Sequence, residues 1–562
     1  MRREVSVVNK KVCSFPILFA LLALLIGTCA VVFPASAQAA PTSTGSITVS
    51  GTVARSYDAY QIFSANVVDG DSDAKIATDL AWASDAVRDA ALPVLHSAGM
   101  PNSQTTAREA AEWLNADSHL TSALSAQLAR SLQSSGAVSV ALNAGTEAEL
   151  PCGYWLIVAD DDAIAQNEAG TAPIMALVGG SAVTVKPKAA TPKVFKHVLE
   201  DSTAAWQKAA DATVADDLYW RLSATVPAGL TAYDTYTVRF VDTMSAGLDP
   251  SKVAASMRVY VAAGADGGFD AVQTGKDGRA GTDPAKGWTD ITAQCATKVA
   301  ADGTFTVRTG DLIAALGGAD AFTAGARVVA VYNAPLNSAC NHGIAKGNPN
   351  EVYLRYPRSP FADQSGDAGF TRTPSDDACA YTWDLALTKR GSDGDKPLAG
   401  AVLSITDDRG RTLAADGTWD AEGKATVTTG EDGRVTVSGV DSGKLEVREL
   451  KAPKGYTAFE GTRSVTVKAE GLDVDQVAAA KPKLTITAES PLRADNADGS
   501  TGSLEASLIN TPTGTPPSIT TGGFMPSTGD MAMYAAAAAA VAGAALIVVA
   551  LLVKRGGGSH KE

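Results

Sequence analysis

The sequence has few of the residues that build catalytic and metal centres. It contains five histidines and six cysteines in 562 residues, and no His/Cys spacing matches a metal site. It also lacks the paired carboxylates and Cys/His pairs that are typical of a catalytic cleft. Its 47 Lys and Arg are outnumbered by 61 Asp and Glu, and the net charge of -14 argues against nucleic acid or an anionic membrane surface as a partner. We therefore expect neither an enzyme nor a protein that binds a metal or cofactor.

Charge is also missing from two long apolar runs, one near each end of the chain. Residues 15–33 follow a basic segment and precede small residues at 37–39, a pattern that predicts a signal peptide over residues 1–39. Residues 531–553 are uncharged and long enough to cross a membrane as a helix. A Lys-Arg pair follows this run and would stay on the cytoplasmic side. We expect export, followed by anchoring through a transmembrane helix and basic tail over residues 530–562.

The cysteines that remain after export are even in number. They are Cys152, Cys295, Cys340 and Cys379, because the other two fall within the signal peptide. An even number of cysteines in an exported chain favours disulfide bonds. The pairing is left open by the sequence, but Cys295 with Cys340 is the pair we favour, since both lie in the same predicted domain.

The exported chain is too long for one hydrophobic core, and about three domains are expected. Residues 40–186 combine alternating strands with a helix-like stretch at 107–132, which predicts a mixed α+β domain. Residues 187–372 and 380–512 show short β-rich runs separated by Gly/Asp turns, the pattern of Ig-like β-sandwiches. The predicted fold class is therefore mainly β, with tandem sandwiches after a mixed N-terminal domain.

A short motif lies directly before the second apolar run. It consists of Met525, Pro526, Ser527, Thr528 and Gly529. It resembles the Leu-Pro-X-Thr-Gly sorting signal of sortase substrates, with methionine in place of leucine, and the Pro/Gly/Thr-rich linker 513–524 would hold it clear of the folded chain. The resemblance implies that a sortase cuts after Thr528, which becomes an acyl donor. The alternative is an ordinary single-pass anchor.

The third predicted domain carries a set of motifs in a characteristic order. They occupy residues 385–389, 396–401, 430–433 and 449–456. In this order they resemble a Cna-type B domain of collagen adhesins, and the last motif is the E-box of that family. The resemblance implies an isopeptide bond between Lys389 on the first strand and Asn510 on the last strand, formed with Glu449 as the catalyst.

The middle domain carries a weaker version of the same pattern. Lys196 lies in a β-rich run, and residues 236–245 resemble the strand that carries the catalytic aspartate in the middle domains of pilins. The resemblance implies that Asp242 is the acid of a second Lys–Asn bond. Two asparagines could close this bond, and we favour Asn337 over Asn350.

The bond chemistry explains why these residue types are needed. Burial lowers the pKa of a lysine and raises that of a carboxyl, so the amine can be neutral and the acid protonated. The acid can then polarise the amide and move protons while ammonia leaves. Because the first domain offers only Lys75 before its end, we expect no bond of this type there.

A further motif lies at the junction between the first two domains. Residues 183–188 resemble the Val-X-Val-Tyr-Pro-Lys pilin motif of Gram-positive shaft pilins. Lys188 aligns with the lysine that attacks the acyl-sortase, and Lys186, in place of the tyrosine, is a competing nucleophile. On these motifs the chain is identified as a sortase-assembled major pilin with Cna-type isopeptide domains, joined head to tail by Thr528–Lys188 amide bonds.

This resemblance implies a location and a set of partners. The subunit would lie in a pilus on the cell wall of a Gram-positive bacterium. Its partners would be a sortase, identical pilin subunits, minor tip and basal pilins and peptidoglycan, with host surface ligands if the fibre serves adhesion. The alternative is a monomeric wall-anchored adhesin that uses the same domains as a stalk.

Overall fold

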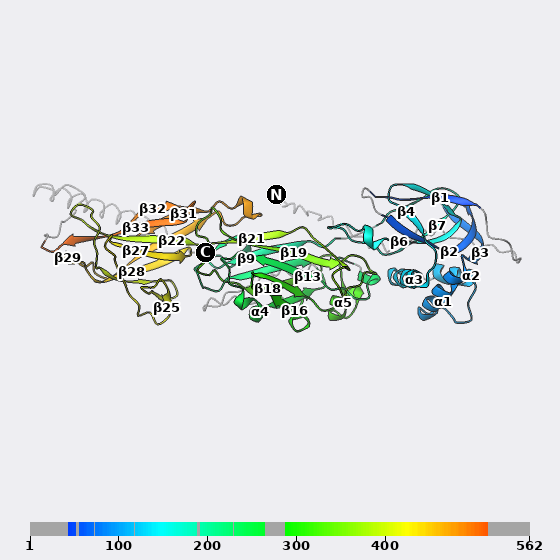
Figure 1. Ribbon diagram of the computed structural model, residues 1–562, viewed down its shortest axis with the longest axis horizontal. Coiled ribbons are helices and arrows are strands. Elements are labelled where there is room, and N and C mark those ends of the chain that lie inside the picture. Colours follow the sequence, from blue (N-terminus) through cyan, green and yellow to red (C-terminus); the bar gives the residue numbers. More distant parts are fainter. Residues whose placement is uncertain are drawn as a thin grey trace, which may run out of the picture.

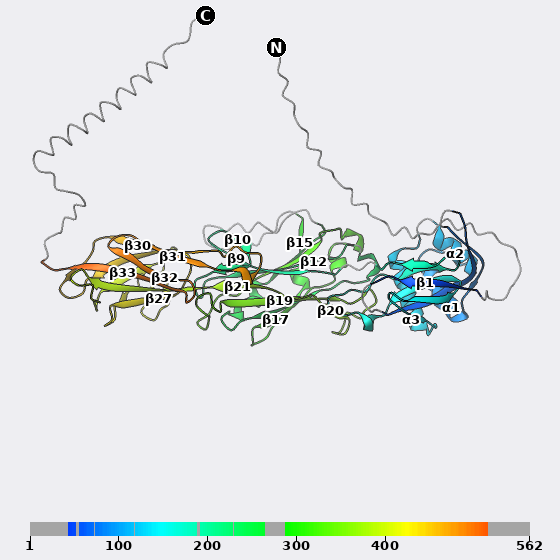
Figure 2. The ribbon, with the colours of Figure 1, turned by 90° about the horizontal axis from the view of Figure 1, so that it is seen from above.

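The computed structural model describes residues 43–51, 56–71, 74–116, 119–187, 191–228, 230–264 and 287–514. These residues form an elongated molecule of three units in a row (Figures 1 and 2), and the mainly β architecture predicted from the sequence is confirmed. We call them the N-terminal unit (43–187), the middle unit (191–381) and the C-terminal unit (382–514).

Several predicted features lie outside the described residues. They are the signal peptide, Lys188, most of the linker, the sorting motif and the membrane anchor. Within the described ranges, no helix combines the length and apolar character that a membrane crossing requires. The described residues therefore bear on the three units and on Lys186, but not on the two ends of the chain.

The N-terminal unit stacks helices and two sheets in layers. Its elements are β1 (Thr44–Val49), β2 (Ser56–Asp69), β3 (Lys75–Trp82), α1 (Asp85–Ser97), α2 (Ala107–Asn115), α3 (Ser122–Ser135), β4 (Val140–Asn143), β5 (Glu147–Pro151), β6 (Gly153–Ala159), β7 (Ile174–Val178) and β8 (Val183–Val185). One sheet has the order β5-β1-β8, and the other has the order β3-β2-β6-β7 with β4 beside β2. On β6, Leu156 and Val158 pack against the helices, whereas Trp155 and Ile157 pack against the smaller sheet. Burial on both faces explains why β6 is almost entirely apolar.

The helix-like stretch predicted at 107–132 forms two helices rather than one. Thr106 and Glu109 make a capping box at the start of α2. The helix ends at Ala116, whose backbone is extended, and α3 begins after Thr121, whose side chain accepts a hydrogen bond from the amide of Leu124. A second N-cap inside the stretch is therefore what divides it.

The middle unit is a sandwich of two sheets. Its elements are β9 (Val194–Glu200), β10 (Ala205–Gln207), β11 (Ala209–Asp211), β12 (Tyr219–Thr225), β13 (Arg239–Met244), α4 (Val253–Ser256), β14 (Arg258–Ala262), β15 (Trp288–Asp290), β16 (Ala296–Val299), β17 (Thr304–Arg308), α5 (Leu312–Ala315), β18 (Arg327–Asn333), β19 (Asn348–Pro357), β20 (Phe370–Arg372) and β21 (Asp376–Tyr381). The sheet orders are β10-β9-β12-β18-β14-β15 and β11-β21-β19-β13-β17-β16, with β20 beside β19. Inward residues of both sheets, such as Trp220, Phe240 and Leu354, form one core.

The chain passes from the middle unit to the C-terminal unit through a single residue. The sequence predicted that the middle domain ends near residue 372, but β21 pairs with β19 and β11 and so belongs to the middle unit. Tyr381 ends β21, and Trp383 begins the first strand of the next unit. Their rings stack with centroids 6.1 Å apart. The connection is therefore short and packed.

The C-terminal unit is a second sandwich. Its strands are β22 (Trp383–Gly391), β23 (Val402–Thr406), β24 (Thr412–Leu413), β25 (Trp419–Asp420), β26 (Val427–Thr428), β27 (Arg434–Val440), β28 (Gly443–Lys451), β29 (Tyr456–Thr457), β30 (Thr462–Glu470), β31 (Lys483–Ala488), β32 (Leu492–Asp498) and β33 (Ser503–Pro512). One sheet has the order β27-β22-β33-β29 with β32 beside β33, and the other has the order β25-β24-β23-β28-β30-β31 with β26 beside β23. The first and last strands, β22 and β33, run parallel and pair directly.

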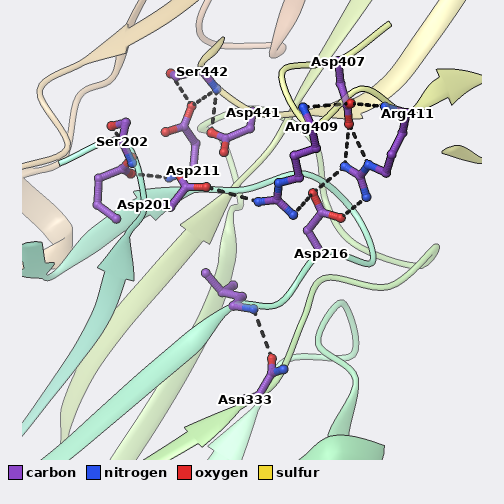
Figure 3. A network of polar contacts seen from close by, with 12 residues as sticks. Asp201, Ser202, Asp211, Asp216, Asn333, Asp407, Arg409, Arg411, Asp441 and Ser442 are labelled. Atoms are coloured by element: carbon purple, nitrogen blue, oxygen red, sulfur yellow. Dashed lines mark hydrogen bonds and ion pairs between the residues drawn. The ribbon is translucent and has the colours of Figure 1, made fainter. Parts of the chain in front are cut away.

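Polar contacts join the middle and C-terminal units (Figure 3). Asp216 of the middle unit accepts two hydrogen bonds from Arg411, at 2.5 and 2.8 Å, and lies 2.8 Å from Arg409. Asp211 accepts hydrogen bonds from the amide and hydroxyl of Ser442, at 2.9 and 2.6 Å. These contacts fix the orientation of one sandwich relative to the other.

Carboxyl groups gather beside these contacts. Burial, together with the neighbouring Asp211, raises the pKa of Glu200 to about 7. Burial also raises the pKa of Asp201, and it raises that of Asp441 well above the usual range, with Asp211, Asp201 and Glu200 all contributing to the latter. The junction therefore holds protons that exposed carboxyl groups would have lost at neutral pH.

The expectation of disulfide bonds was wrong. Cys152, Cys295, Cys340 and Cys379 are all free thiols. The favoured pair does not form because the two side chains have other neighbours: the thiol of Cys295 donates to the carbonyl of Ile291 at 3.2 Å, and that of Cys340 lies 3.5 Å from the ring of His342. An even number of cysteines in an exported chain says nothing about the distances between them. A disulfide bond can form only between cysteines that lie close enough together.

Candidate functional sites

The predicted residues of the C-terminal unit lie together inside the sandwich. Lys389 is on β22, Asn510 is on the adjacent β33, and Glu449 is on β28 of the opposite sheet. On β22, Leu385, Leu387 and Lys389 are all buried, so the lysine takes a position where strand alternation predicts an apolar side chain. The side chains of Lys389 and Glu449 are 0% exposed. An ionisable pair thus occupies positions where apolar core side chains would normally stand.

The distances within this cluster are short. The side-chain amide of Asn510 donates to both carboxyl oxygens of Glu449, at 2.9 and 3.0 Å. The Nζ atom of Lys389 lies 3.6 Å from Oε1 of Glu449 and donates to the carbonyl of Leu508 at 3.2 Å. The amide of Phe459 donates to Oε2 of Glu449 at 3.1 Å, which fixes the carboxyl group. Amine, carboxyl and amide are therefore held in one place.

Burial changes the acid–base balance of this cluster. It lowers the pKa of Lys389 to about 8, although the nearby Glu449 favours the charged amine. A lysine with such a pKa is partly neutral near pH 7 to 8, whereas an exposed lysine is almost wholly charged. The neutral amine is the nucleophilic form.

A second cluster of the same kind lies in the core of the middle unit. It is formed by Lys196 on β9, Asp242 on β13, Tyr332 on β18 and Asn350 on β19, and each of these residues is fully buried. Strands β13 and β19 are neighbours, with Met244 paired to Asn350. Strands β9 and β18 flank β12 in the facing sheet. The cluster therefore spans both sheets of the sandwich.

The hydroxyl of Tyr332 connects the members of this second cluster. It accepts hydrogen bonds from Nζ of Lys196 at 2.9 Å and from the side-chain amide of Asn350 at 2.8 Å, and it donates to Oδ2 of Asp242 at 3.2 Å. Lys196 also makes an ion pair with Asp242. The Nζ atom lies 5.5 Å from the ring centroids of Trp220 and Tyr332, so aromatic faces surround the amine.

The asparagine favoured from the sequence does not lie in this cluster. Asn337 is partly exposed, donates to the carbonyl of Ala246 at 2.9 Å and accepts from the amide of Ala339 at 2.8 Å. These contacts place it in a loop after β18. Of the two asparagines left open by the sequence, the structure brings Asn350 to Lys196.

Burial shifts Lys196 and Asp242 of the second cluster toward their neutral forms. It lowers the pKa of Lys196 to about 8 and raises the pKa of Asp242 to about 6, and in each case the partner charge acts in the opposite direction. The lysine and the carboxyl therefore approach the protonation states that amide attack requires.

Sequence reasoning missed a lysine–aspartate pair beside this cluster, in which Lys208 is buried and Asp376 is partly exposed. Lys208 makes an ion pair with Asp376 and donates to the carbonyl of Lys196 at 2.9 Å. The same carboxyl of Asp376 accepts the backbone amide of Lys196 at 2.6 Å. The pair thus fixes the backbone on both sides of Lys196. Its only sequence signal is a lysine next to the short buried strand β11.

Two further lysines considered from the sequence, Lys186 and Lys75, lie in the N-terminal unit. Lys186 is exposed and directly follows β8. Lys75 donates to the carbonyls of Gly179 and Ser181, at 2.6 and 2.7 Å, and makes an ion pair with Asp69 at 3.1 Å. The amine of Lys75 therefore holds the loop after β7 in place.

Part of the C-terminal unit matches a known family model. Residues 384–481 match the SpaA model, described as a prealbumin-like fold domain. The matched range includes Lys389 and Glu449 and ends before Asn510. It covers β22 through β30 and therefore most of the strands of this unit.

The chain is also similar to known surface proteins. It is 29% identical over 175 residues to the trypsin-resistant surface T6 protein of Streptococcus pyogenes serotype M6, a match that covers 30% of this chain and 30% of that relative. Among solved structures, the T6 backbone pilin of serotype M6 Streptococcus pyogenes aligns over 84% of this chain and 98% of that chain, at 17% identity and a TM-score of 0.45. The full-length major pilin SpaD from Corynebacterium diphtheriae aligns over 84% and 98%, at 16% identity and a TM-score of 0.40.

Proposed function

We propose that the chain is a structural subunit of a covalently assembled surface pilus, with two of its units each locked by an intramolecular Lys–Asn bond. The observation that carries the proposal is the repeated burial of an amine, a carboxyl and an amide together in both sandwiches. An unpaired buried lysine is costly, and so is a buried ion pair with imperfect contacts. Because burying an amine, a carboxyl and an amide together is costly and occurs in both sandwiches, we infer that the arrangement serves bond formation.

In the C-terminal unit the bond would join Lys389 to Asn510. The neutral amine attacks the side-chain carbonyl carbon, a C–N bond forms, and the original bond from that carbon to Nδ2 breaks. Glu449, which already contacts Nδ2, takes up the proton that the lysine loses and gives a proton to the leaving nitrogen. One ammonia is released, and the carboxyl group ends unchanged.

In the middle unit the bond would join Lys196 to Asn350, with Asp242 as the acid. This assignment replaces Asn337, because Asn350 shares a hydrogen-bond partner, Tyr332, with Lys196. In the structure the amide oxygens of Asn350 and Asn510 have no hydrogen-bond partner, whereas their nitrogens do. In both units, therefore, the amide nitrogen that would leave is held by a hydrogen bond, whereas the amide oxygen is not.

The placement of the two bonds suits a fibre under tension. The bond in the C-terminal unit would tie the first strand, β22, to the last strand, β33. The bond in the middle unit would tie the first strand, β9, to β19, which lies late in that unit. Force applied along the chain would then pass through covalent bonds instead of peeling strands from a sheet. Each crosslink also restricts the unfolded chain.

We propose that subunits are joined by a sortase through the motif Met525–Gly529, with Thr528 as acyl donor and Lys188 of the next subunit as nucleophile. Lys186 is the alternative nucleophile, since it is exposed at the same junction. The similarity to the T6 protein, and to backbone and major pilins of known structure, supports an assembly of this kind. The further partners would be minor tip and basal pilins and peptidoglycan, on a Gram-positive cell wall.

A denaturing gel of wall extract tests this function. Covalent head-to-tail joining predicts a ladder of high-mass species that survives boiling in detergent. A single band at the mass of one subunit would instead support the monomeric adhesin.

A further inference from the structure

The two buried clusters differ in how the carboxyl reaches the leaving amide. In the C-terminal unit both oxygens of Glu449 accept directly from Nδ2 of Asn510, at 2.9 and 3.0 Å. In the middle unit Nδ2 of Asn350 donates to the hydroxyl of Tyr332 at 2.8 Å. That hydroxyl, in turn, bonds to Asp242 at 3.2 Å. Aspartate has one methylene fewer than glutamate, and the tyrosine hydroxyl occupies the space between acid and amide.

We propose that Tyr332 is a catalytic residue that relays a proton from Asp242 to the departing nitrogen of Asn350. This inference rests on the proposed Lys196–Asn350 bond and adds a residue to its mechanism. The C-terminal unit needs no relay, since Glu449 contacts the leaving nitrogen itself.

The hydroxyl of Tyr332 has the bonding capacity that a relay requires. A phenol has one proton to donate and two lone pairs that accept. In the structure all three are used, with Lys196 and Asn350 as donors and Asp242 as the acceptor. Burial raises the pKa of Tyr332 well above its usual value, so the group stays a neutral phenol. The hydroxyl can therefore accept a proton from Asp242 only when it gives its own proton to the nitrogen of Asn350.

The ring of Tyr332 is fixed in position. The side chain is fully buried, and its ring meets that of Phe305 edge to face, with centroids 4.8 Å apart. Strand β18, which carries it, is paired on both sides, by β12 and β14. The hydroxyl therefore has little freedom to move away from Asp242 and Asn350, although its O–H bond can rotate.

The proton balance of the step closes with these groups alone. As the amine of Lys196 attacks, the side-chain carbonyl carbon of Asn350 becomes tetrahedral, and the lone pair of its nitrogen is released from amide conjugation and becomes basic. The hydroxyl of Tyr332 gives its proton to that nitrogen and recovers one from protonated Asp242. Asp242 takes up the proton that Lys196 loses when the new amide forms. The products are an isopeptide bond and ammonia, and both Tyr332 and Asp242 return to their starting states.

The test is the rate of bond formation in Tyr332→Phe, measured in freshly synthesised full-length chain. Samples are quenched over time and digested, and the crosslinked peptides of each unit are quantified by mass spectrometry. We expect the middle bond to form about a hundredfold more slowly, as for loss of a general acid. The Lys389–Asn510 bond of the same molecules should keep its wild-type rate, which makes it an internal control. Equal rates of the middle bond in Tyr332→Phe and wild type would overturn the relay.

The pH dependence separates a relay from a merely structural role. Without the phenol the leaving nitrogen must take its proton from solvent. The ratio of the mutant rate to the wild-type rate should therefore rise as the pH is lowered. A ratio that stays constant with pH would overturn the relay. Tyr356→Phe is the matched control, because Tyr356 is a buried tyrosine of the same core whose hydroxyl bonds to the carbonyl of Glu168 at 2.9 Å.

Two further outcomes are decisive. If the middle unit of Tyr332→Phe does not resist trypsin, 3-fluorotyrosine is placed at position 332 instead. This residue keeps the ring and hydroxyl but is more acidic, so a changed rate supports the relay and an unchanged rate overturns it.

If wild-type protein forms no Lys196–Asn350 peptide, the proposed bond fails and the relay fails with it. A normal wild-type bond with an unaffected Tyr332→Phe rejects the relay alone.

Discussion

The indole of Trp383 donates a hydrogen bond to Asp211 at 2.7 Å, across the junction between the middle and C-terminal units. Both side chains are buried, and Trp383 begins β22, with only Thr382 between it and the end of β21. The same carboxyl of Asp211 also holds Ser442. The junction is therefore a packed interface rather than a flexible linker.

The first prediction concerns pH at this junction. Burial raises the pKa of Glu200 from 4.5 to about 7, so the folded state holds a proton that the unfolded state loses. The stability from this group is complete below about pH 4.5 and is lost as the pH rises toward 7. We expect the melting temperature to fall by a few degrees between pH 5 and pH 8, and Glu200→Gln to reduce that fall.

The shifted Asp201 and Asp441 act in the same direction, so some of the slope should remain in Glu200→Gln. The exposed Glu422→Gln should leave it unchanged. Calorimetry at a series of pH values makes the measurement, and an equal slope in Glu200→Gln and wild type would contradict the prediction.

The second prediction concerns the acid of the C-terminal unit. Glu449→Ala should abolish the Lys389–Asn510 bond, so the intact mass should rise by one ammonia relative to that expected for the substitution alone. Loss of the crosslink should lower the free energy of unfolding by about 4 kcal/mol and make this unit sensitive to trypsin. The control is Glu446→Ala on the same strand, where an exposed carboxyl pairs with Lys444. It should change neither property. An unchanged mass deficit in Glu449→Ala would reject its role.

The third prediction separates the two asparagines of the middle unit. Asn350→Ala should lose the middle bond and regain one ammonia, because its amide is the one that lies in the cluster. Asn337→Ala should keep the full mass deficit, with at most a small loss of stability from its loop contacts. Intact mass spectrometry of the two variants is sufficient. The reverse result would restore the assignment first favoured from the sequence.

The fourth prediction concerns assembly. Lys188→Arg keeps the charge but replaces the amine with a guanidinium that stays protonated and cannot attack. The variant should be exported and attached to the wall as a monomer, with both internal bonds intact. Loss of the ladder in Lys186→Arg but not in Lys188→Arg would move the nucleophile to Lys186. A ladder that survives in both would reject a junction lysine as the point of joining.

Much of the fold could be predicted from the sequence. Strand alternation and Gly/Asp turns indicated a mainly β chain, and the E-box and its companion motifs grouped Lys389, Glu449 and Asn510 before the structure placed them together. This grouping rested on the resemblance of those motifs to a known family, and the structure shows all three side chains buried.

The middle cluster could not be predicted as fully. Whether Asn337 or Asn350 faces Lys196 depends on the pairing of β19 with β13, which places Asn350 opposite Met244. Register of this kind is set by contacts between distant segments. Tyr332 was missed because an aromatic residue in a β-rich run is usually only part of the core, and its hydroxyl contacts depend on the same pairing.

The most direct test of the two intramolecular Lys–Asn bonds is the intact mass of the full wild-type chain after signal-peptide removal. Two intramolecular bonds predict a mass lower than the sequence mass by two molecules of ammonia, with crosslinked peptides that join Lys196 to Asn350 and Lys389 to Asn510. A mass equal to that of the unmodified sequence would contradict it.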